Sequence, residues 1–298
     1  MNTKVTVIGG AGFIGSHLVE ELVSLGFEVT VIDNFSTGNV FNLEKVKVKI
    51  VSLDILDGPH SLVKHLAGSS CVFHLAALTS VQESIENPYF YTQVNVVGTA
   101  NVLEACKTAR VEKLIFSSTS AVYGNTTVFP TSEKVKPDPL STYALTKLVG
   151  EQYCKYYSEV TPTLSTVCLR YFNVYGDRTN PKSSYRSVLP IFIDQAKAGK
   201  PLTYTNDGGQ ARDFIHVSDV VKANIAAMNI RSHHEVLNIG SGEMISINQI
   251  MDHIGGTRQY IGGRLEPRIS HADTTRAQSI LSWAPRVNLL NWIKDQIG

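Results

Sequence analysis

The chain has 298 residues, of which 43% are hydrophobic and 18% charged, and its 27 basic and 26 acidic side chains leave a net charge of +1. This composition supports a sizeable buried core, and the balanced charge argues against a partner such as nucleic acid, whose binders usually carry clustered Lys and Arg. No run approaches the roughly 18 apolar residues of a membrane span, and no secretory signal pattern is seen at the N-terminus, so we expect a cytoplasmic protein without a membrane partner.

The first half of the chain alternates apolar segments typical of buried strands with amphipathic segments typical of helices. Strands are predicted at 4–8, 28–32, 47–51, 71–75, 113–118 and 163–170, and helices at 13–25, 89–109 and 141–158. This alternation indicates right-handed strand–helix–strand crossovers. The predicted fold class is therefore α/β, a doubly wound parallel sheet of Rossmann type.

The pattern changes after about residue 173. Residues 174–186 are polar and rich in turn formers, which predicts a loop. A helix at 187–198, a strand at 202–204 and core strands at 213–217 and 235–239 with a helix between them follow, and 240–298 alternates short helices with one strand. We expect a large domain of residues 1–173 plus about 213–240, and a smaller α/β C-terminal lobe of about 174–212 plus 241–298.

The cysteines and histidines show no metal-ligand or redox spacing. Cys71, Cys106, Cys154 and Cys168 form no CxxC pair and lie in apolar or helical surroundings. Buried free thiols are expected, in keeping with a reducing compartment. The nine histidines also lack metal-ligand spacing, so no metal site is predicted.

A glycine-rich turn follows the first strand. Gly9, Gly12 and Gly15 have the spacing G-x-x-G-x-x-G between a strand and a helix, where a dinucleotide pyrophosphate can approach bare backbone. Asp33 ends the second strand, where a carboxylate accepts hydrogen bonds from an adenosine ribose and repels a 2′-phosphate. NAD is therefore predicted in preference to NADP. The alternative is a packing turn, with Asp33 as a turn residue.

A second motif carries chemistry. Tyr143 and Lys147 form Y-x-x-x-K on a predicted helix, one turn apart on the same face. An ammonium beside a phenol favours the phenolate, and so would the positive charge of an oxidised nicotinamide. The tyrosine can then act as a base near neutral pH. Hydroxyl groups of 117–120 end a predicted strand, where this fold binds ligands. The alternative is a tyrosine–lysine pair on a solvated helix face.

These motifs together resemble the extended short-chain dehydrogenase/reductases, and most closely the nucleoside-diphosphate-sugar epimerases of the UDP-glucose/UDP-galactose 4-epimerase type. The segments that carry the resemblance are GGAGFIGS (9–16), DNFSTG (33–38), LDI (53–55), HLAA (74–77), NVVGTANVLEA (95–105), SSTSAVYG (117–124), YALTK (143–147), RYFNVYG (170–176) and RDFIHVSDV (212–220). It implies that the large domain binds NAD and that the smaller lobe binds a nucleotide sugar.

By this resemblance, NAD is the cofactor, with Asp33 and Asn34 at the adenosine ribose and Asp54–Ile55 beside the adenine. The residues implied to bind it are Gly9, Gly12, Phe13, Ile14, Gly15, Asp33, Asn34, Ser36, Thr37, Gly38, Asp54, Ile55, Leu75, Ala76, Ala77, Asn95, Ser117, Tyr143, Lys147 and Tyr171. The catalytic residues implied are Thr119, Tyr143 and Lys147.

The resemblance also implies a UDP-sugar substrate and a homodimer. The implied substrate residues are Thr119, Asn173, Val188, Tyr204, Arg212, Arg264 and Ser270. Alternatives stay open for three of them: a structural salt bridge for Arg212, a core tyrosine for Tyr204 and a turn hydroxyl for Ser270. The subunits would pair through the helices near 95–109 and 141–158, which carry apolar residues Val96, Val97, Val102, Leu103, Leu148 and Val149.

The implied reaction inverts C4 of a UDP-hexose through a transient 4-keto sugar, with glucose/galactose or the N-acetylhexosamine pair as the sugar. Sugar dehydratases and UDP-glucuronate decarboxylases resemble this chain here but carry a carboxylate one or two positions after the threonine that corresponds to Thr119. This chain has Ser120 and Ala121 at those positions. The remaining alternatives are another NAD-dependent nucleotide-sugar epimerase or reductase, and a non-catalytic dinucleotide-sensing module.

Overall fold

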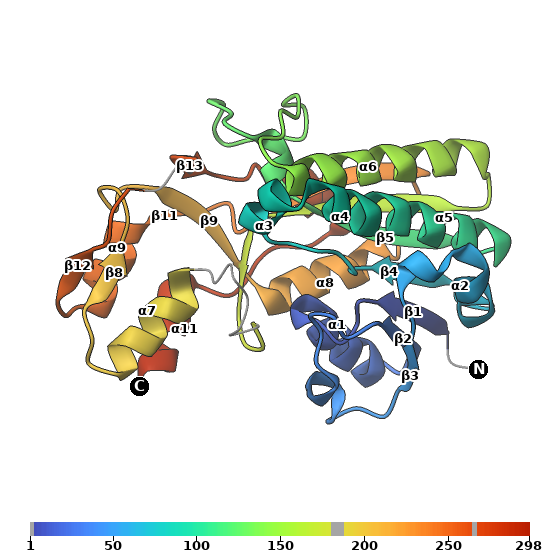
Figure 1. Ribbon diagram of the computed structural model, residues 1–298, viewed down its shortest axis with the longest axis horizontal. Coiled ribbons are helices and arrows are strands. Elements are labelled where there is room, and N and C mark those ends of the chain that lie inside the picture. The colour runs from blue at the N-terminus through green and yellow to red at the C-terminus, as the bar shows by residue number, and fades with distance from the viewer. Residues whose placement is uncertain (1–2, 180–187, 264–266) are drawn as a thin grey trace.

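A seven-stranded, fully parallel sheet is the centre of the larger part of the molecule (Figure 1). The computed structural model describes residues 3–179, 188–263 and 267–298. In spatial order the strands are β10 (His234–Ile239), β6 (Ser165–Tyr171), β5 (Lys113–Thr119), β4 (Cys71–His74), β1 (Lys4–Ile8), β2 (Glu28–Asp33) and β3 (Lys49–Ser52). The chain order reverses between β1 and β4, and this switch point is where such sheets bind ligands.

Helices cover both faces of this sheet, which is why its central strands are continuous apolar runs. α1 (Phe13–Ser24), α8 (Val217–Ala227) and α10 (Thr275–Leu281) pack on one face, and α2 (Pro59–Leu66), α5 (Gly98–Thr108) and α6 (Thr142–Val160) pack on the other. The predicted doubly wound α/β fold is confirmed. Cys71, Cys106, Cys154 and Cys168 are buried free thiols in these two apolar layers.

The helix predicted at 89–109 is interrupted. It consists of α4 (Pro88–Thr92), a π-helical turn (Gln93–Val97) and α5, and the short α3 (Val81–Glu86) precedes it. The wider π turn coincides with buried Asn95, whose side chain bonds the neighbouring loop. Of the apolar residues expected at a subunit interface, Val102 and Leu103 instead face the sheet and are fully buried, because α5 lies flat on it.

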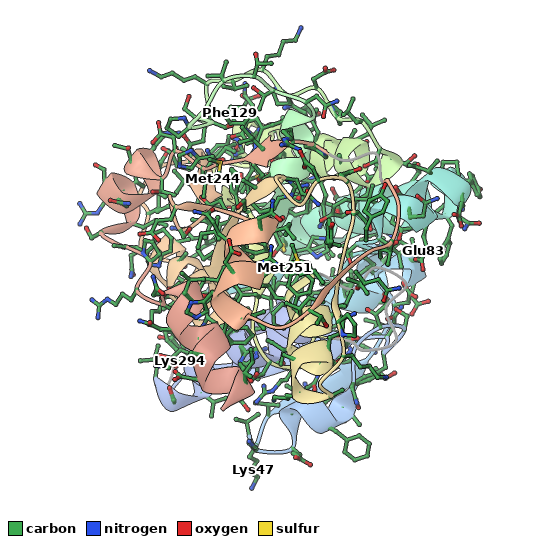
Figure 2. All side chains as sticks on the ribbon, turned by 90° about the vertical axis from the view of Figure 1, so that its left-hand side faces the viewer. Lys47, Glu83, Phe129, Met244, Met251 and Lys294 are labelled. Atoms are coloured by element: carbon green, nitrogen blue, oxygen red, sulfur yellow. The ribbon has the colours of Figure 1, made fainter. Side chains whose placement is uncertain are left out.

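The smaller part of the molecule contains a second sheet. Its central strand β9 (Ala211–His216) pairs with β7 (Asn173–Tyr175), β11 (Met244–Ser246) and β13 (Ile269–Ser270), and a separate pair joins β8 (Leu202–Tyr204) to β12 (Arg258–Tyr260). Helices α7 (Val188–Lys197), α9 (Ile247–Ile254) and α11 (Leu289–Ile297) enclose its apolar core. Figure 2 views the molecule from the side of this smaller part, with Met251 of α9 near the centre of the picture and Lys294 on α11.

Two expectations about this part are corrected. Residues 174 and 175 belong to β7 rather than to a loop, because β9 offers them a parallel partner. Strand β9, predicted as 213–217, spans Ala211–His216 and pairs with β7, β11 and β13, while its assignment to the large domain stays a prediction. The segment after residue 240 holds three short strands rather than one, each completed by a partner distant in sequence. Among the described helices, none is long and apolar enough to cross a membrane.

Candidate active site

The turn between β1 and α1 lies against the loop that follows β4. A Cβ on Gly9, whose φ is +82°, would lie 2.5 Å from the Ala76 amide nitrogen, and a Cβ on Gly15 would lie 2.2 Å from the Gly9 carbonyl oxygen. Glycine is therefore required at both positions. Gly12 precedes α1, and no described side chain caps the start of this helix at Phe13 and Ile14. The N–H groups of an uncapped helix start suit an anion.

Asp33 lies at the end of β2 with its carboxylate turned toward this turn. Its Oδ2 accepts the Ala11 N–H at 2.9 Å and its Oδ1 accepts the Phe35 N–H at 2.8 Å. Burial raises the pKa of Asp33, and the two hydrogen bonds oppose that rise. Each carboxylate oxygen retains a lone pair that can accept a ribose hydroxyl. Thr37 is exposed nearby, and a Cβ on Gly38 would lie 3.0 Å from Asp33 Oδ1.

The next predicted residues surround the outer end of this site. Asn34 donates from Nδ2 to Asp54 Oδ2 at 2.8 Å and accepts the Ser36 N–H at 3.0 Å. Asn34 therefore joins the ends of β2 and β3. The Ile55 side chain is directed into the core, where a Cβ on Gly98 would lie 2.4 Å from its Cδ1. Any contact of Ile55 with an adenine would therefore use its backbone.

The loop after β4 is held in place from two sides. The N–H groups of Leu75 and Ala76 donate to Ile8, at 2.8 and 3.0 Å, and Ala77 follows half-buried. Asn95 accepts the Leu78 N–H at 2.9 Å and donates to the Leu78 carbonyl at 3.0 Å. Its Nδ2 also donates to the Thr146 hydroxyl at 3.1 Å. The Asn95 amide thus supports this loop through contacts within the protein.

Helix α6 carries the Y-x-x-x-K pair on its inner face. The Ser141 hydroxyl caps the helix by accepting the Ala144 N–H at 3.2 Å, which places Tyr143 in the first turn. Lys147, one turn later, donates from Nζ to the Ser117 carbonyl at 2.8 Å. Its Nζ also lies 4.9 Å from the centre of the Phe116 ring. Burial lowers the pKa of Lys147 to about 8.

Thr119 at the end of β5 meets Tyr143. The Thr119 Oγ1 accepts the Ala121 N–H at 3.1 Å, which leaves its hydroxyl hydrogen to donate to the Tyr143 oxygen. Burial nevertheless raises the pKa of Tyr143 to about 12, and the Thr119 hydrogen bond opposes this rise. In the protein without cofactor, desolvation of the phenol thus outweighs the groups around it. The prediction that Lys147 and an oxidised nicotinamide together favour the phenolate stays a prediction.

The predicted residues Ser117 and Tyr171 contact each other in the core beneath this pair. The Ser117 Oγ and Tyr171 Oη lie 3.1 Å apart, and Tyr171 donates to Asn224 Oδ1 at 2.9 Å. Both residues are buried. The Tyr171 hydroxyl therefore links β5, β6 and α8 under the carboxyl ends of the strands.

Three predicted substrate residues come together on the smaller sheet. Ser270 of β13 pairs directly with Arg212 of β9, so their side chains lie on the same face. Arg212 donates from Nη1 to the Arg268 carbonyl at 3.3 Å. Asn173 on β7 donates from Nδ2 to the Asp213 carbonyl at 2.8 Å. The adjacency of these residues arises from two strand pairings, which join Ser270 to Arg212 and Asn173 to Phe214, 58 and 41 positions apart in sequence.

The remaining predicted substrate residues lie elsewhere on the smaller lobe. Val188 begins α7 and packs at the edge of its core. Tyr204 on β8 is half-buried, and its ring lies 5.8 Å from that of Tyr260 on β12. Arg264 falls outside the described residues.

Sequence reasoning missed a buried polar group beside the Tyr143–Lys147 pair. Glu151 forms an ion pair with Arg170, and Arg170 also donates to the Tyr123 hydroxyl. Glu151 follows Lys147 by one helical turn, a spacing that was visible in the sequence. Asp213 was also missed, although it directly follows Arg212 in a quoted motif.

Comparison with known proteins identifies the family of the chain. The model of the NAD dependent epimerase/dehydratase family matches residues 5–240. The chain belongs to this family, as its motifs indicated, and the predicted cofactor NAD is confirmed with it. The glycine turn, the uncapped start of α1 and the Asp33 carboxylate are a donor and acceptor set that fits this dinucleotide.

Several full-length relatives carry epimerase names. A putative UDP-glucose 4-epimerase of Methanocaldococcus jannaschii is 37% identical, with 98% of each chain covered. The structure of UDP-glucose 4-epimerase with UDP-glucose from Thermotoga maritima has a TM-score of 0.93 at 35% identity, covering 99% of this chain and 97% of that one. UDP-N-acetylglucosamine 4-epimerase from Methanobrevibacter ruminantium has a TM-score of 0.92 at 35% identity, covering 99% and 96%. The predicted enzyme class, an isomerase of the UDP-sugar 4-epimerase type, is confirmed at this level.

Proposed function

We propose that this enzyme inverts C4 of UDP-glucose and UDP-galactose, and that it also accepts the corresponding N-acetylhexosamines. The larger domain would hold NAD, and the smaller lobe would hold the UDP-sugar. The full-length likeness to epimerases of both sugar classes supports this proposal. A cytoplasmic location is proposed with it, in keeping with four buried free thiols.

The observation that carries the reaction type is the set of groups around Tyr143. Thr119 donates to Tyr143, while the two residues after Thr119 form a short turn that bears no carboxylate. The buried carboxylate of Glu151 accepts Arg170 Nε at 2.8 Å and Nη2 at 2.6 Å, and it also accepts the Ser118 hydroxyl. A carboxylate held this way is not free to act as the extra acid or base of an elimination. Proton transfer at one hydroxyl is the chemistry that remains.

In the proposed mechanism, Tyr143 takes the proton of the C4 hydroxyl and later returns it. Thr119 orients that hydroxyl and stabilises the phenolate by donating a hydrogen bond. Lys147, held by the Ser117 carbonyl, adds positive charge to the site and orients the cofactor ribose. NAD, when bound, would accept the C4 hydride, return the same hydride, and add a further positive charge. The 4-keto sugar would turn within the smaller lobe before the hydride returns, so the hydride would reach the opposite face of C4.

The direct test is incubation of the purified enzyme with UDP-, GDP-, CDP- and dTDP-sugars, with each product identified by NMR. We expect C4 epimers of UDP-hexoses and no net change in redox state. Formation of a 4-keto-6-deoxy sugar, a pentose or a reduced sugar would instead show that the reaction type is wrong.

The acceptance of N-acetyl sugars rests on Ser270, which lies beside Arg212 on the smaller sheet. A small side chain there leaves room for an acetamido group at C2, because exclusion of a substrate requires bulk or an unpaired polar group. In Ser270→Tyr we expect kcat/KM for UDP-N-acetylglucosamine to fall by about tenfold or more relative to UDP-glucose. An unchanged ratio, or a wild type inactive on the acetylated sugar, would contradict this assignment.

We also propose a homodimer that pairs α4 and α6 with their copies. Large apolar side chains are exposed along α4, the π-helical turn that follows it and α6: Tyr89, Phe90, Val97, Leu145, Tyr153 and Tyr156. Exposed large apolar side chains of this kind are typical of a subunit interface.

A further inference from the structure

The segment Ile269–Asp273, here named the wall segment, passes between the two parts of the molecule. It contains Ser270, so its position relative to Thr119 and Tyr143 matters for the proposed reaction. Ala272 packs with Val122, Tyr123 and Phe172 in a small apolar cluster between the lobes. Two buried polar groups hold the segment there, one from each part of the molecule.

The first is a chain of hydrogen bonds through Tyr123. The Tyr123 hydroxyl accepts Arg170 Nη1 at 2.8 Å and donates to Asn238 Oδ1 at 2.7 Å. Asn238 in turn donates from Nδ2 to the Thr131 carbonyl at 2.9 Å and to the Asp273 carbonyl at 3.3 Å. Tyr123 is 3% exposed and Asn238 is fully buried, so water does not compete for these bonds.

Thr131 connects the same chain to the wall segment through its backbone. Its N–H donates to the His271 carbonyl at 2.8 Å, and its carbonyl accepts the Asp273 N–H at 3.0 Å. The wall segment is therefore bonded to Thr131 and Asn238 at two of its residues, His271 and Asp273.

The other end of this chain reaches the catalytic helix. Arg170 holds Glu151 through two nitrogens, and Glu151 also accepts the hydroxyl of Ser118. Glu151 lies one turn beyond Lys147 on α6, and Ser118 directly precedes Thr119 on β5. A continuous series of buried hydrogen bonds thus runs from the wall segment to Glu151 and Ser118, which lie on the same helix and strand as the proposed catalytic residues.

The second group is Asp213 on β9, whose side chain is fully buried. Its Oδ1 accepts the Ser241 N–H at 2.6 Å and the Ser241 hydroxyl at 2.8 Å. Its Oδ2 accepts the Gly242 N–H at 3.0 Å and the Ala272 N–H at 3.1 Å. One carboxylate therefore fixes both the loop after β10 and the wall segment.

Gly240 packs closely against Ala272 and Asp213, and this packing restricts the position of the wall segment further. A Cβ on Gly240 would lie 2.6 Å from the Ala272 Cβ and 2.9 Å from Asp213 Oδ2. Buried polar networks that are fully bonded specify one arrangement, whereas apolar contacts alone tolerate sliding. A displacement of about 1 Å at a substrate-binding surface is enough to weaken productive binding.

We propose that Tyr123 and Asp213 are positioning residues that set the place of the wall segment against Thr119 and Tyr143, and thereby the affinity of the enzyme for its nucleotide sugar. This inference rests on the proposed function for its catalytic consequence. Neither side chain touches the reacting atoms; each acts through the backbone of the wall segment.

The main test variant is Tyr123→Phe, which removes one oxygen and leaves the Arg170 and Asn238 groups without their shared partner. The matched control is Tyr157→Phe on α6, whose hydroxyl donates to Glu104 at 2.9 Å and takes no part in the series. Asp213→Asn is the second variant. It replaces one of the two acceptor oxygens by a donor and remains informative if Tyr123→Phe does not fold.

Two measurements are made on the NAD-loaded proteins. Amide hydrogen exchange of a peptide covering 268–276 reports the position of the wall segment directly, and we expect about tenfold faster exchange in Tyr123→Phe and Asp213→Asn than in Tyr157→Phe. Steady-state kinetics with UDP-glucose should give a KM raised about threefold or more, a kcat within about twofold and unchanged NAD content.

The outcomes separate this inference from the proposed function. Unchanged exchange in both variants overturns it, as does a fall in kcat at constant KM, which is what a merely structural role would produce. If the wild type epimerises no UDP-sugar, the proposed function fails, while the exchange measurement still decides whether Tyr123 and Asp213 hold the wall segment.

Discussion

Burial shifts the pKa values of two side chains of the candidate site in opposite directions. Burial raises the pKa of Tyr143 to about 12 and lowers the pKa of Lys147 to about 8. Both shifts disfavour the charged form, because a buried ion loses its hydration. We therefore expect the proposed base, Tyr143, to form a phenolate only when the Thr119 hydrogen bond is supplemented by the positive charge of a bound cofactor.

Tyr143→Phe removes the group that accepts the proton and leaves the ring in place. We expect kcat to fall by at least about a hundredfold, because the remaining hydroxyl of Thr119 is a poor base. NAD content should be unchanged, as measured by the absorbance of nucleotide released from the purified protein. Turnover close to that of the wild type would show that another residue is the base.

The shift of Lys147 also makes a prediction for stability. Its pKa is about 8 in the folded protein and 10.5 in an unfolded chain, so the unfolded state binds more protons between these pH values. The free energy of unfolding of the wild type should rise relative to Lys147→Met from pH 8 to about 10.5, by roughly 3 kcal/mol. Below pH 8 the difference should stay constant.

Urea denaturation of the two NAD-free proteins at a series of pH values measures this difference. Parallel stability curves over the whole range would mean that Lys147 is not destabilised by burial.

The turn between β1 and α1 shows how elements distant in sequence constrain each other. Gly9 and Gly26 both have positive φ, +82° and +84°, yet only Gly9 faces another loop. A side chain at Gly26 would meet nothing within 4 Å, whereas one at Gly9 would press on the backbone of the loop after β4. Substitutions at these two glycines therefore distinguish the effect of backbone strain, which both share, from the effect of steric conflict, which occurs only at Gly9.

Gly9→Ala should therefore weaken NAD binding by at least about a hundredfold, since the phosphate turn and the loop after β4 must move apart. Gly26→Ala carries a comparable backbone strain of about 1 kcal/mol and should leave NAD affinity unchanged. Isothermal titration of NAD into the two variants decides the matter. Equal affinities would indicate that the close approach at Gly9 is not needed by the cofactor.

At the scale of the whole molecule, α6 has two different faces. One bears Lys147 and Glu151 toward the sheet, and the other bears Leu145 and Tyr156, which are 50% and 57% exposed. Tyr89 on α4 is 75% exposed in the same region. The proposed dimer would thus rest directly on the back of the catalytic helix.

A charge on this surface should dissociate the proposed dimer, because an unpaired carboxylate is costly to desolvate. We expect a dimer for the wild type and a monomer for Tyr89→Glu combined with Tyr156→Glu, by sedimentation equilibrium at micromolar concentration. Phe41→Glu is the control, since Phe41 is 72% exposed but lies on the turn after β2. A monomeric wild type would refute the assembly.

The parallel α/β sheet, the glycine turn, the position of Asp33 at the end of β2 and the Tyr143–Lys147 pair could all be predicted from the sequence alone. Each of these depends on a short-range regularity: apolar runs with the period of strands and helices, a turn that only glycine tolerates, or two side chains one helical turn apart. Local patterns of this kind can be recognised in the sequence without knowing which distant residues they contact.

The strand pairing of the smaller sheet and the direction of the Tyr143 pKa shift could be obtained from the tertiary structure but not from the sequence. Strand β7 exists because β9 lies beside it, and Ser270 meets Arg212 because β13 completes the same sheet. Tyr123 and Asn238 are bonded across 115 positions of sequence. Strand register, desolvation and hydrogen-bond partners depend on which surfaces the folded chain brings together, and no periodicity along the chain specifies that choice.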